Sequence, residues 1–189
     1  MLQRSGGLEI EMGKKVVIIS SSPRKGGNSD VLCDEFQRGS KEAGHQTVKI
    51  NLRDLELHFC RACYSCRKTG VCIQKDDFSG VLEEMASADV IVLATPVYFY
   101  SMAGQLKTLI DRCLSGGAKP AGKEFYFIAT AAAGKAEMER TIDGLRGFTD
   151  CLPKAKVKGV IYGAGAWQLG DIQGNSAMEE AYQMGKQIA

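Results

Sequence analysis

A polar stretch from Ser20 to Asp30 carries an unusual density of hydrogen-bond donors. It has the sequence SSSPRKGGNSD and follows the apolar run VVII, residues 16–19, without a spacer. A turn that only reverses the chain needs Gly, Pro or Asn, and has no use for three hydroxyls and two cations. The composition therefore indicates that an anionic ligand binds here.

A second stretch with chemical potential holds four of the seven cysteines. Cys60, Cys63 and Cys66 are spaced by two residues, and Cys72 follows after five more. Three thiols at this spacing fold around a common centre, and a fourth can complete a tetrahedral set. Zinc, a redox dithiol such as Cys63 with Cys66, and four plain reduced thiols are all compatible with the pattern.

Length and charge limit the classes of partner. The 189 residues suffice for one domain of ordinary size. The net charge of +2, from 24 basic and 22 acidic residues, offers no broad field for nucleic acid or an anionic membrane, so we expect neither as a partner. An odd cysteine count without a secretory signal argues against a disulfide framework and for a cytoplasmic protein.

The chain must place both stretches on one scaffold. Residues 1–13 are polar and Gly-bearing, and we interpret them as a flexible leader before a single domain at 14–189. Short runs rich in β-branched or aromatic residues then recur, and several show no alternation, as in strands buried on both faces. The five predicted strands are Val16–Ile19, Thr47–Ile50, Val90–Ala94, Phe125–Ala129 and Val157–Tyr162.

Segments of helical period lie between these runs. They predict helices at Ser29–Ala43, around Val81–Met85, around Leu106–Leu114, and at Glu137–Thr149 and Ala177–Ile188. Gly44 is placed to end the first helix. Strands that alternate with helices predict an open parallel α/β sheet covered on both faces. Ligands bind such sheets beyond the carboxyl ends of the strands, where the loops after strands one to four meet.

The loop after the first strand fits a phosphate monoester. Its hydroxyls and the side chains of Arg24, Lys25 and Asn28 precede a helix whose amino end carries free amides and partial positive charge. Gly26 and Gly27 let the backbone approach the ligand closely. Neither the Walker spacing nor G-x-G-x-x-G is present. The alternative is a simple helix cap at Asn28 or Ser29.

The loops after the third and fourth strands suit a flat apolar ligand. Three aromatic residues, Tyr98, Phe99 and Tyr100, leave the third strand together, and could stack on a planar ring or pack at a subunit contact. The small residues of TAAAGK, 130–135, would let a ring lie close to the backbone. We assign no role to Trp167, His45 or His58.

These motifs resemble those of the flavodoxin-like NAD(P)H-dependent FMN reductase family. Residues 21–29 are similar to its phosphate loop G-S-P-R-x-x-G-N-[ST], with Ser21 where many members have Gly. Residues 95–98 resemble its [ST]-P-V/I-Y segment, and Gly104–Lys107 with Asp111-Arg112 resembles its G-x-L-K…D-R. The likeness extends from about Lys15 to the end of the chain.

The resemblance implies a fold, a cofactor and a reaction. The fold would be a three-layer sandwich with a five-stranded parallel sheet in the order 2-1-3-4-5. The protein would bind FMN, take hydride from NAD(P)H as a transient substrate, and need no catalytic side chain. By the same analogy we expect a homodimer or homotetramer. The expected FMN-binding residues are Ser20, Ser22, Arg24, Lys25, Gly27, Asn28, Ser29, Thr95, Pro96, Val97, Tyr98, Phe99, Thr130, Ala131 and Gly134.

The cysteine spacing resembles that of the iron-sulfur flavoproteins, a branch of the same family. This implies a 4Fe-4S cluster held by Cys60, Cys63, Cys66 and Cys72. Electrons from the flavin would then go to the cluster, to a quinone or to a free flavin. Two other interpretations remain, a flavodoxin-type carrier reduced by a partner protein and a cysteine-based redox-sensing or metal-binding module.

Overall fold

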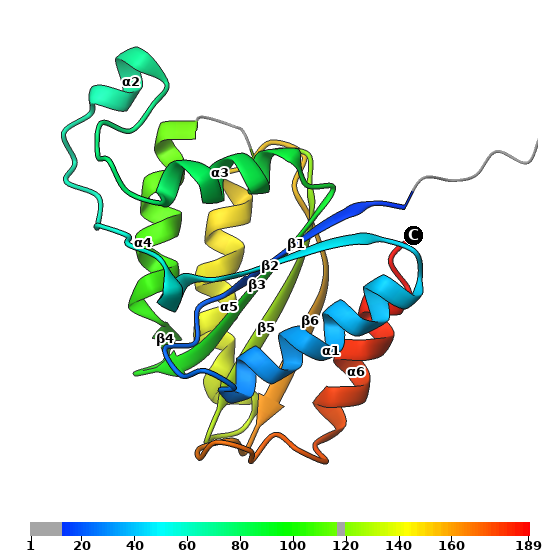
Figure 1. Ribbon diagram of the computed structural model, residues 1–189. Helices are drawn as coiled ribbons and strands as arrows, with labels where there is room; N and C mark the ends of the chain where they lie inside the picture. The colour runs from blue at the N-terminus through cyan, green and yellow to red at the C-terminus, as the bar shows by residue number, and fades with distance from the viewer. Residues whose placement is uncertain (1–12, 117–119) are drawn as a thin grey trace, which may run out of the picture.

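The computed structural model describes residues 13–116 and 120–189. Apart from Gly13, the predicted leader lies outside these ranges. Five parallel strands form one sheet in the order β2-β1-β3-β5-β6 (Figure 1). They are β1(Lys15–Ser20), β2(Gln46–Asn51), β3(Val90–Tyr98), β5(Glu124–Ala131) and β6(Lys156–Ala164).

The predicted strands and their order are confirmed, with one addition. Strand β4(Ser101–Met102) pairs antiparallel with the end of β3 that extends beyond the sheet. The sequence has no signal for β4, because two residues cannot show a period. Phe99 and Tyr100 form the turn between β3 and β4, and both have positive φ, 50° and 62°. Hairpin turns of two residues require this conformation, which usually selects Asn or Gly rather than aromatic residues.

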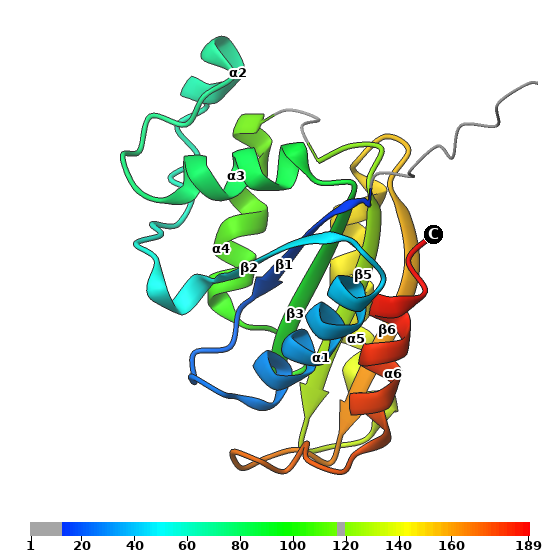
Figure 2. The ribbon, with the colours of Figure 1, turned by 45° about the vertical axis from the view of Figure 1, so that its right-hand side comes forward.

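Helices cover both faces of the sheet, as Figures 1 and 2 show. Val16 and Ile18 of β1 belong to the core under α1(Asn28–Glu42) and α6(Ser176–Lys186). Their neighbours Val17 and Ile19 belong to the core on the other face. That core includes residues of α3(Phe78–Ser87), α4(Gly104–Arg112) and α5(Lys135–Asp150). Burial on both faces explains why this strand shows no polar alternation.

The predicted helices are all present, with ends that differ by a few residues. Gly44 follows α1 with φ of +89°, as expected for a residue that ends a helix. Three short elements were not predicted: α2(Ser65–Thr69) and the 3-10 turns η1(Leu52–Asp54) and η2(Cys113–Gly116). Within the described ranges, no helix is long and apolar enough to cross a membrane.

The backbones of α1 and α6 touch at two glycines. A Cβ on Gly39 would lie 2.0 Å from the carbonyl oxygen of Tyr182, and one on Gly185 would lie 2.1 Å from that of Phe36. Real Cβ atoms do not approach backbone oxygens this closely, so neither position accepts a side chain without moving a helix. The contact fixes α1 against α6.

We expect Gly185→Ala to lower the free energy of unfolding by about 3 kcal/mol, because the new methyl group forces α1 and α6 apart. Gly147→Ala in α5 is the matched control: apart from its chain neighbours and the backbone of its own helix, no atom lies within 4 Å of its Cβ position. The control should stabilise the protein by up to about 1 kcal/mol, since Ala favours helix over Gly. Urea unfolding of both variants measures the difference, and equal stabilities would contradict the close contact.

Candidate functional site

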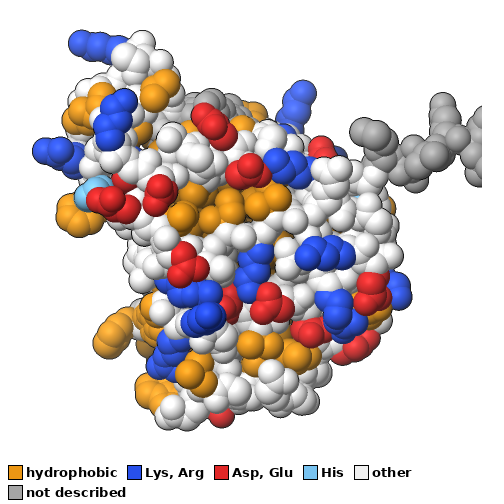
Figure 3. Space-filling view, viewed as in Figure 1, with side chains coloured by type: hydrophobic (Ala, Val, Ile, Leu, Met, Phe, Trp, Pro, Cys, Tyr) orange, Lys and Arg blue, Asp and Glu red, His pale blue; other side chains and the backbone are white. Residues whose placement is uncertain are grey.

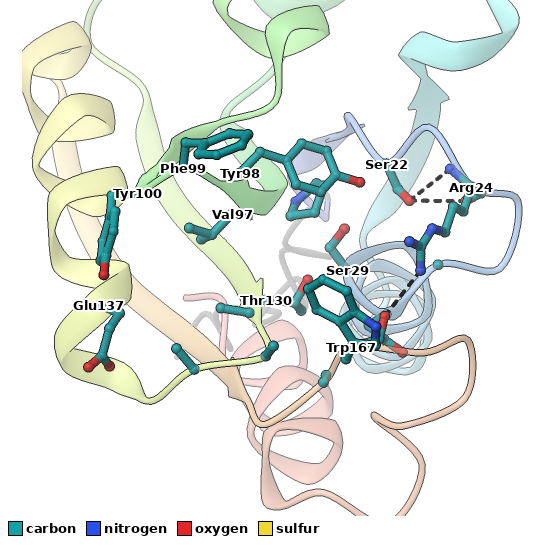
Figure 4. Close-up of a pocket in the computed structure, with 17 residues that line it drawn as sticks. Ser22, Arg24, Ser29, Val97, Tyr98, Phe99, Tyr100, Thr130, Glu137 and Trp167 are labelled. Atoms are coloured by element: carbon teal, nitrogen blue, oxygen red, sulfur yellow. Dashed lines mark hydrogen bonds between the residues drawn. The ribbon is translucent and has the colours of Figure 1, made fainter.

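A cavity of about 280 Å³ lies at the carboxyl ends of the strands (Figure 4). The loops after β1, β3, β5 and β6 all contribute to its walls. This is where open parallel sheets bind their ligands. The lining residues are Ser22, Arg24, Gly27, Asn28, Ser29, Pro96, Val97, Tyr98, Phe99, Tyr100, Thr130, Ala131, Ala132, Ala133, Glu137, Ala166 and Trp167.

The loop after β1 is folded tightly by its own hydrogen bonds. The hydroxyl of Ser22 donates to the carbonyl of Arg24 (3.0 Å) and accepts from the Arg24 amide (3.2 Å). A Cβ on Gly27 would lie 2.3 Å from Ser22 Oγ, so a side chain there would displace the Ser22 hydroxyl from its hydrogen bonds. The loop then passes directly into α1, with Gly27 at the N-cap. The first amides of α1 consequently face the cavity wall that Ser22, Gly27 and Ser29 form.

Ser29 in the first turn of α1 has an unusual environment. Its side chain is 1% exposed, lines the cavity, and its hydroxyl has no hydrogen-bond partner among the described residues. Burying a hydroxyl without a partner costs about 1–3 kcal/mol, so such groups normally bind something. Arg24 from the preceding loop also lines the cavity. A hydroxyl, a guanidinium and a helix amino end together suit a phosphate group.

Behind the loop lies the buried carboxylate of Asp30. It accepts hydrogen bonds from the Ser20 hydroxyl (3.0 Å) and the Gly26 amide (3.1 Å). Lys49 from β2 and Arg53 from η1 neutralise it, at 2.7 and 3.0 Å. The carboxylate thus ties the β1 loop to α1 and to the neighbouring strand.

Charge pairing outweighs burial at this network. Burial alone would raise the pKa of Asp30 and lower that of Lys49. The hydrogen bond and charge that the two groups share have the opposite effect. The pKa of Asp30 therefore lies below its ordinary value and the pKa of Lys49 above its own.

The loop after β3 presents its aromatic side chains because its base is held. Thr95, fully buried, accepts a hydrogen bond from the Ala103 amide (2.9 Å) and donates to the carbonyl of Pro96 (2.8 Å). This closes the base of the β3–β4 hairpin. Tyr98, Phe99 and Tyr100 line the cavity but remain largely exposed, and Phe99 has no cover at all. The cavity therefore has an apolar side opposite its polar end.

Most of the predicted FMN-binding residues line this one cavity, but Ser20, Lys25, Thr95 and Gly134 do not. The hydroxyl of Ser20 is used by Asp30, and that of Thr95 by the hairpin. Lys25 is exposed outside the cavity. The side-chain amide of Asn28 lines it, yet donates to the carbonyl of Gln168 (2.9 Å) rather than standing free.

The sequence analysis missed Glu137, Ala166 and Trp167. Glu137 is in the first turn of α5, and the other two follow β6. The loop after the fifth strand was left out of the predicted set, although its strand also ends at this edge of the sheet. Tyr100, Ala132 and Ala133 belong to motifs that were recognised but were not among the predicted binding residues.

All four clustered cysteines line a second, separate cavity of about 140 Å³. They lie on the segment that carries α2, which projects from the layered body (Figure 1). Figure 3 shows hydrophobic and basic side chains together on this projection. Across residues 13–116 and 120–189, no three Cys, His, Asp or Glu side chains are yet grouped closely enough to hold a metal ion. The four thiols therefore line one cavity, but their sulfur atoms are not close enough together to ligate one metal ion.

The local electrostatics favour thiolates at two of these cysteines. Hydrogen bonds from the backbone and hydroxyl of Ser65 lower the pKa of Cys63. At Cys72, burial would raise the pKa, but the backbone of Gln74 and the guanidinium of Arg112 outweigh it and lower the pKa. Thiolates are the form that binds iron or zinc. The donor set therefore fits a metal centre.

One guanidinium clamps both ends of the cysteine segment. Arg112 of α4 donates to the carbonyl of His58 (2.9 Å) and to both carboxylate oxygens of Asp76, and its guanidinium lies over the ring of Phe78. The Asp76 side chain is fully buried. Burial would raise its pKa, but the hydrogen bonds from Arg112 and His58 outweigh it and hold the pKa well below the ordinary range. The Asp-Arg motif of the sequence thus provides Arg112 for structure rather than for the cavity at the strand ends.

Comparison with known proteins gives a consistent result. The family model described as NADPH-dependent FMN reductase matches residues 14–167. An iron-sulfur flavoprotein of Archaeoglobus fulgidus is 30% identical over 179 residues, covering 93% of this chain and 79% of that protein. Another, of Methanocaldococcus jannaschii, is 38% identical over 136 residues, covering 71% and 70%. The solved NAD(P)H:quinone oxidoreductase from Methanothermobacter marburgensis has the same fold, with a TM-score of 0.72 at 17% identity over 92% of this chain and 95% of that chain.

We expect Asp30→Asn to lower the free energy of unfolding by about 3 kcal/mol at pH 7, because it leaves two buried cations without their anion. Asp34→Asn is the control: Asp34 also pairs with Lys49, at 2.5 Å, but is more than half exposed, and it should change stability by less than about 0.5 kcal/mol.

The difference in stability between the wild type and Asp30→Asn should decrease as the pH falls. Because the pKa of Asp30 is depressed by folding, its contribution is complete above the ordinary Asp pKa of about 3.9 and is lost as the pH falls through the folded value. The stabilities of the wild type and Asp30→Asn should therefore converge below about pH 4. A gap that stays constant from pH 7 down to pH 3 would contradict a charged Asp30.

Proposed function

The chain belongs to the NADPH-dependent FMN reductase family, and we propose on this basis that its strand-end cavity binds FMN and that NAD(P)H reduces the bound flavin. The family makes the protein a flavoprotein oxidoreductase. The assignment of individual residues to the flavin, the electron acceptor and the metal cluster belong to the proposal.

The two ends of the cavity would receive the two ends of FMN. We assign the phosphate to the hydroxyl of Ser29, to the amides after Gly27 and to Arg24. The Ser22 hydroxyl donates to the Arg24 carbonyl and holds the loop. The isoalloxazine ring is assigned to the apolar side, where the lining residues are Pro96, Val97, Tyr98, Phe99, Thr130 and Ala131. Ser20, Asn28 and Thr95 act one step away, by holding the loops in place. Direct contacts of Lys25 and Gly134 with FMN stay predictions.

One observation carries the FMN proposal. The Ser29 hydroxyl is buried at the amino end of α1 with no hydrogen-bond partner among the described residues, and it lines the same cavity as Arg24 and four aromatic side chains. A phosphate ester with a planar ring attached supplies what both ends lack: acceptors for Ser29 and Arg24, and a face for the aromatic residues.

Bound FMN supplies the redox chemistry, since it accepts a hydride from a nicotinamide and passes electrons on singly or in pairs. The chain binds and orients the flavin. Because the flavin carries the hydride chemistry, we assign no catalytic residue. Glu137 is the one carboxylate among the described residues that line the cavity.

We propose further that Cys60, Cys63, Cys66 and Cys72 hold a 4Fe-4S cluster. The four thiols line one cavity, two of them have lowered pKa values, and the two relatives described above are named iron-sulfur flavoproteins. The cluster, a quinone or a free flavin would be the electron acceptor. A zinc site would use the same four thiolates, so the metal must be measured.

The exposed turn at Phe99 and Tyr100 supports assembly of several subunits. Phe99 is completely exposed and Tyr100 half exposed, and both lie beside the cavity. Exposed aromatic residues of this kind commonly pack at subunit contacts. We propose a homodimer or homotetramer in which this turn is covered.

Arg24→Ala should raise the Kd of FMN by about 10- to 100-fold, because it removes a charge-assisted hydrogen bond to the phosphate. Riboflavin, which has no phosphate, should lose far less affinity. Arg38→Ala removes an equal charge from the exposed side of α1 and should leave both Kd values unchanged. Titration of the apoprotein followed by flavin fluorescence measures all of them. Equal losses for FMN and riboflavin would contradict the phosphate assignment.

Anaerobically purified protein should contain iron as well as flavin, with broad visible absorption beneath the flavin bands. Cys63→Ser should lose the iron and that absorption but keep its FMN, since the cysteine cavity is separate from the strand-end cavity. Cys151→Ser, at an exposed cysteine outside both cavities, should keep both. Iron and zinc analysis with the visible spectrum distinguishes the outcomes, and zinc in place of iron would refute the cluster.

A further inference from the structure

Trp167 is a large apolar side chain that the fold leaves uncovered. It lines the strand-end cavity, yet 66% of its surface is exposed. Figure 4 shows it on the opposite side of the cavity from Tyr98, with Ser29 and Thr130 between them. The indole therefore lies at the wall of the cavity with most of its surface open to solvent.

Several hydrogen bonds fix the backbone on both sides of Trp167. Its amide and that of Gln168 both donate to one carboxylate oxygen of Asp171, at 2.9 and 2.6 Å. Before it, the Ala166 amide donates to the carbonyl of Ala131 (2.8 Å), which joins this loop to the loop after β5. An exposed indole on a fixed backbone is not explained by packing within the chain.

Two further bonds connect Trp167 to the phosphate end of the cavity. A guanidinium nitrogen of Arg24 donates to the carbonyl of Trp167 (3.1 Å), and the Asn28 amide donates to the carbonyl of Gln168 (2.9 Å). Both donors belong to the β1 loop and the start of α1. The residues that form the phosphate end thus also hold the loop that carries the indole.

We propose that Trp167 is a flavin-binding residue that forms one wall of the ring site. Its loop is positioned by Arg24, Asn28 and Asp171. This inference rests on the proposed function, because it concerns how the same cavity holds FMN. A planar ring that packs against the indole buries more apolar surface than a ring without that wall.

Arg24 connects the two ends of the ligand site in this arrangement. A guanidinium has five N–H donors, and the Trp167 carbonyl uses one of them. The other donors are left for a phosphate. A single side chain therefore binds the phosphate and holds the wall that covers the ring.

Trp167→Ala should raise the Kd of FMN and of riboflavin by the same factor, about 10-fold, because it removes ring stacking and leaves the phosphate contacts intact. Leu169→Ala is the matched control, since Leu169 is exposed on the same loop and does not line the cavity. It should leave both Kd values unchanged. Trp167→Phe keeps an aromatic wall and should recover most of the affinity.

Asp171→Ala tests the positioning of the loop, because Asp171 does not line the cavity. Asp171→Ala alone should raise the Kd of riboflavin several-fold. When it is added to Trp167→Ala, the Kd should rise little beyond that of Trp167→Ala. The emission of bound flavin should rise in Trp167→Ala, since an adjacent indole quenches it.

The two proposals fail differently in these titrations. A wild type that binds neither flavin overturns the proposed function and this inference with it. A wild type that binds FMN, with unchanged riboflavin affinity and flavin emission in Trp167→Ala, overturns the role of Trp167 alone.

Discussion

The carboxylate of Asp30 is the charge on which the ligand end of this molecule depends. It is buried in the first turn of a helix and takes hydrogen bonds from the end of β1 and from the Gly26 amide. The ion pairs with Lys49 and Arg53 offset the free-energy cost of burying this charge. An anion so near the amino end of α1 would oppose a phosphate, but its two cations offset its charge. The helix amides and Arg24 are therefore left to an incoming anion.

Much of the fold follows from local patterns in the chain. The apolar run from Val16 to Ile19 predicts a strand buried on both faces, and Gly44 predicts the end of α1. Both can be recognised in the sequence because each signal lies within a few residues. The phosphate loop is recognisable for the same reason. The hydrogen-bond partners of the Ser20 and Thr95 hydroxyls could not be predicted from the sequence. They depend on whether a hydroxyl at the end of a strand points to the cavity or to a neighbouring segment.

Other parts of the site depend on contacts between distant segments. Trp167 meets Arg24 across 143 residues of chain, and Arg112 reaches Asp76 from another element. No spacing in the sequence predicts such pairs. The contact of Trp167 with Arg24 follows from the parallel sheet, which places the carboxyl ends of β1 and β6 at one edge. The four cysteines present the reverse case: their spacing is clear in the sequence, whereas their common cavity depends on the clamp at Arg112.

The contact of α1 with α6 through Gly39 and Gly185 affects how the site meets its ligand. A helix locked backbone to backbone cannot slide along its axis when an anion arrives at its amino end. The proposed phosphate end would thus be preorganised, and little ordering entropy would be lost on association. Any adjustment during binding would fall to the exposed side chains of the hairpin and of Trp167, whose backbones are held, so the proposed phosphate contacts would form first and the side chains would settle on the ring second.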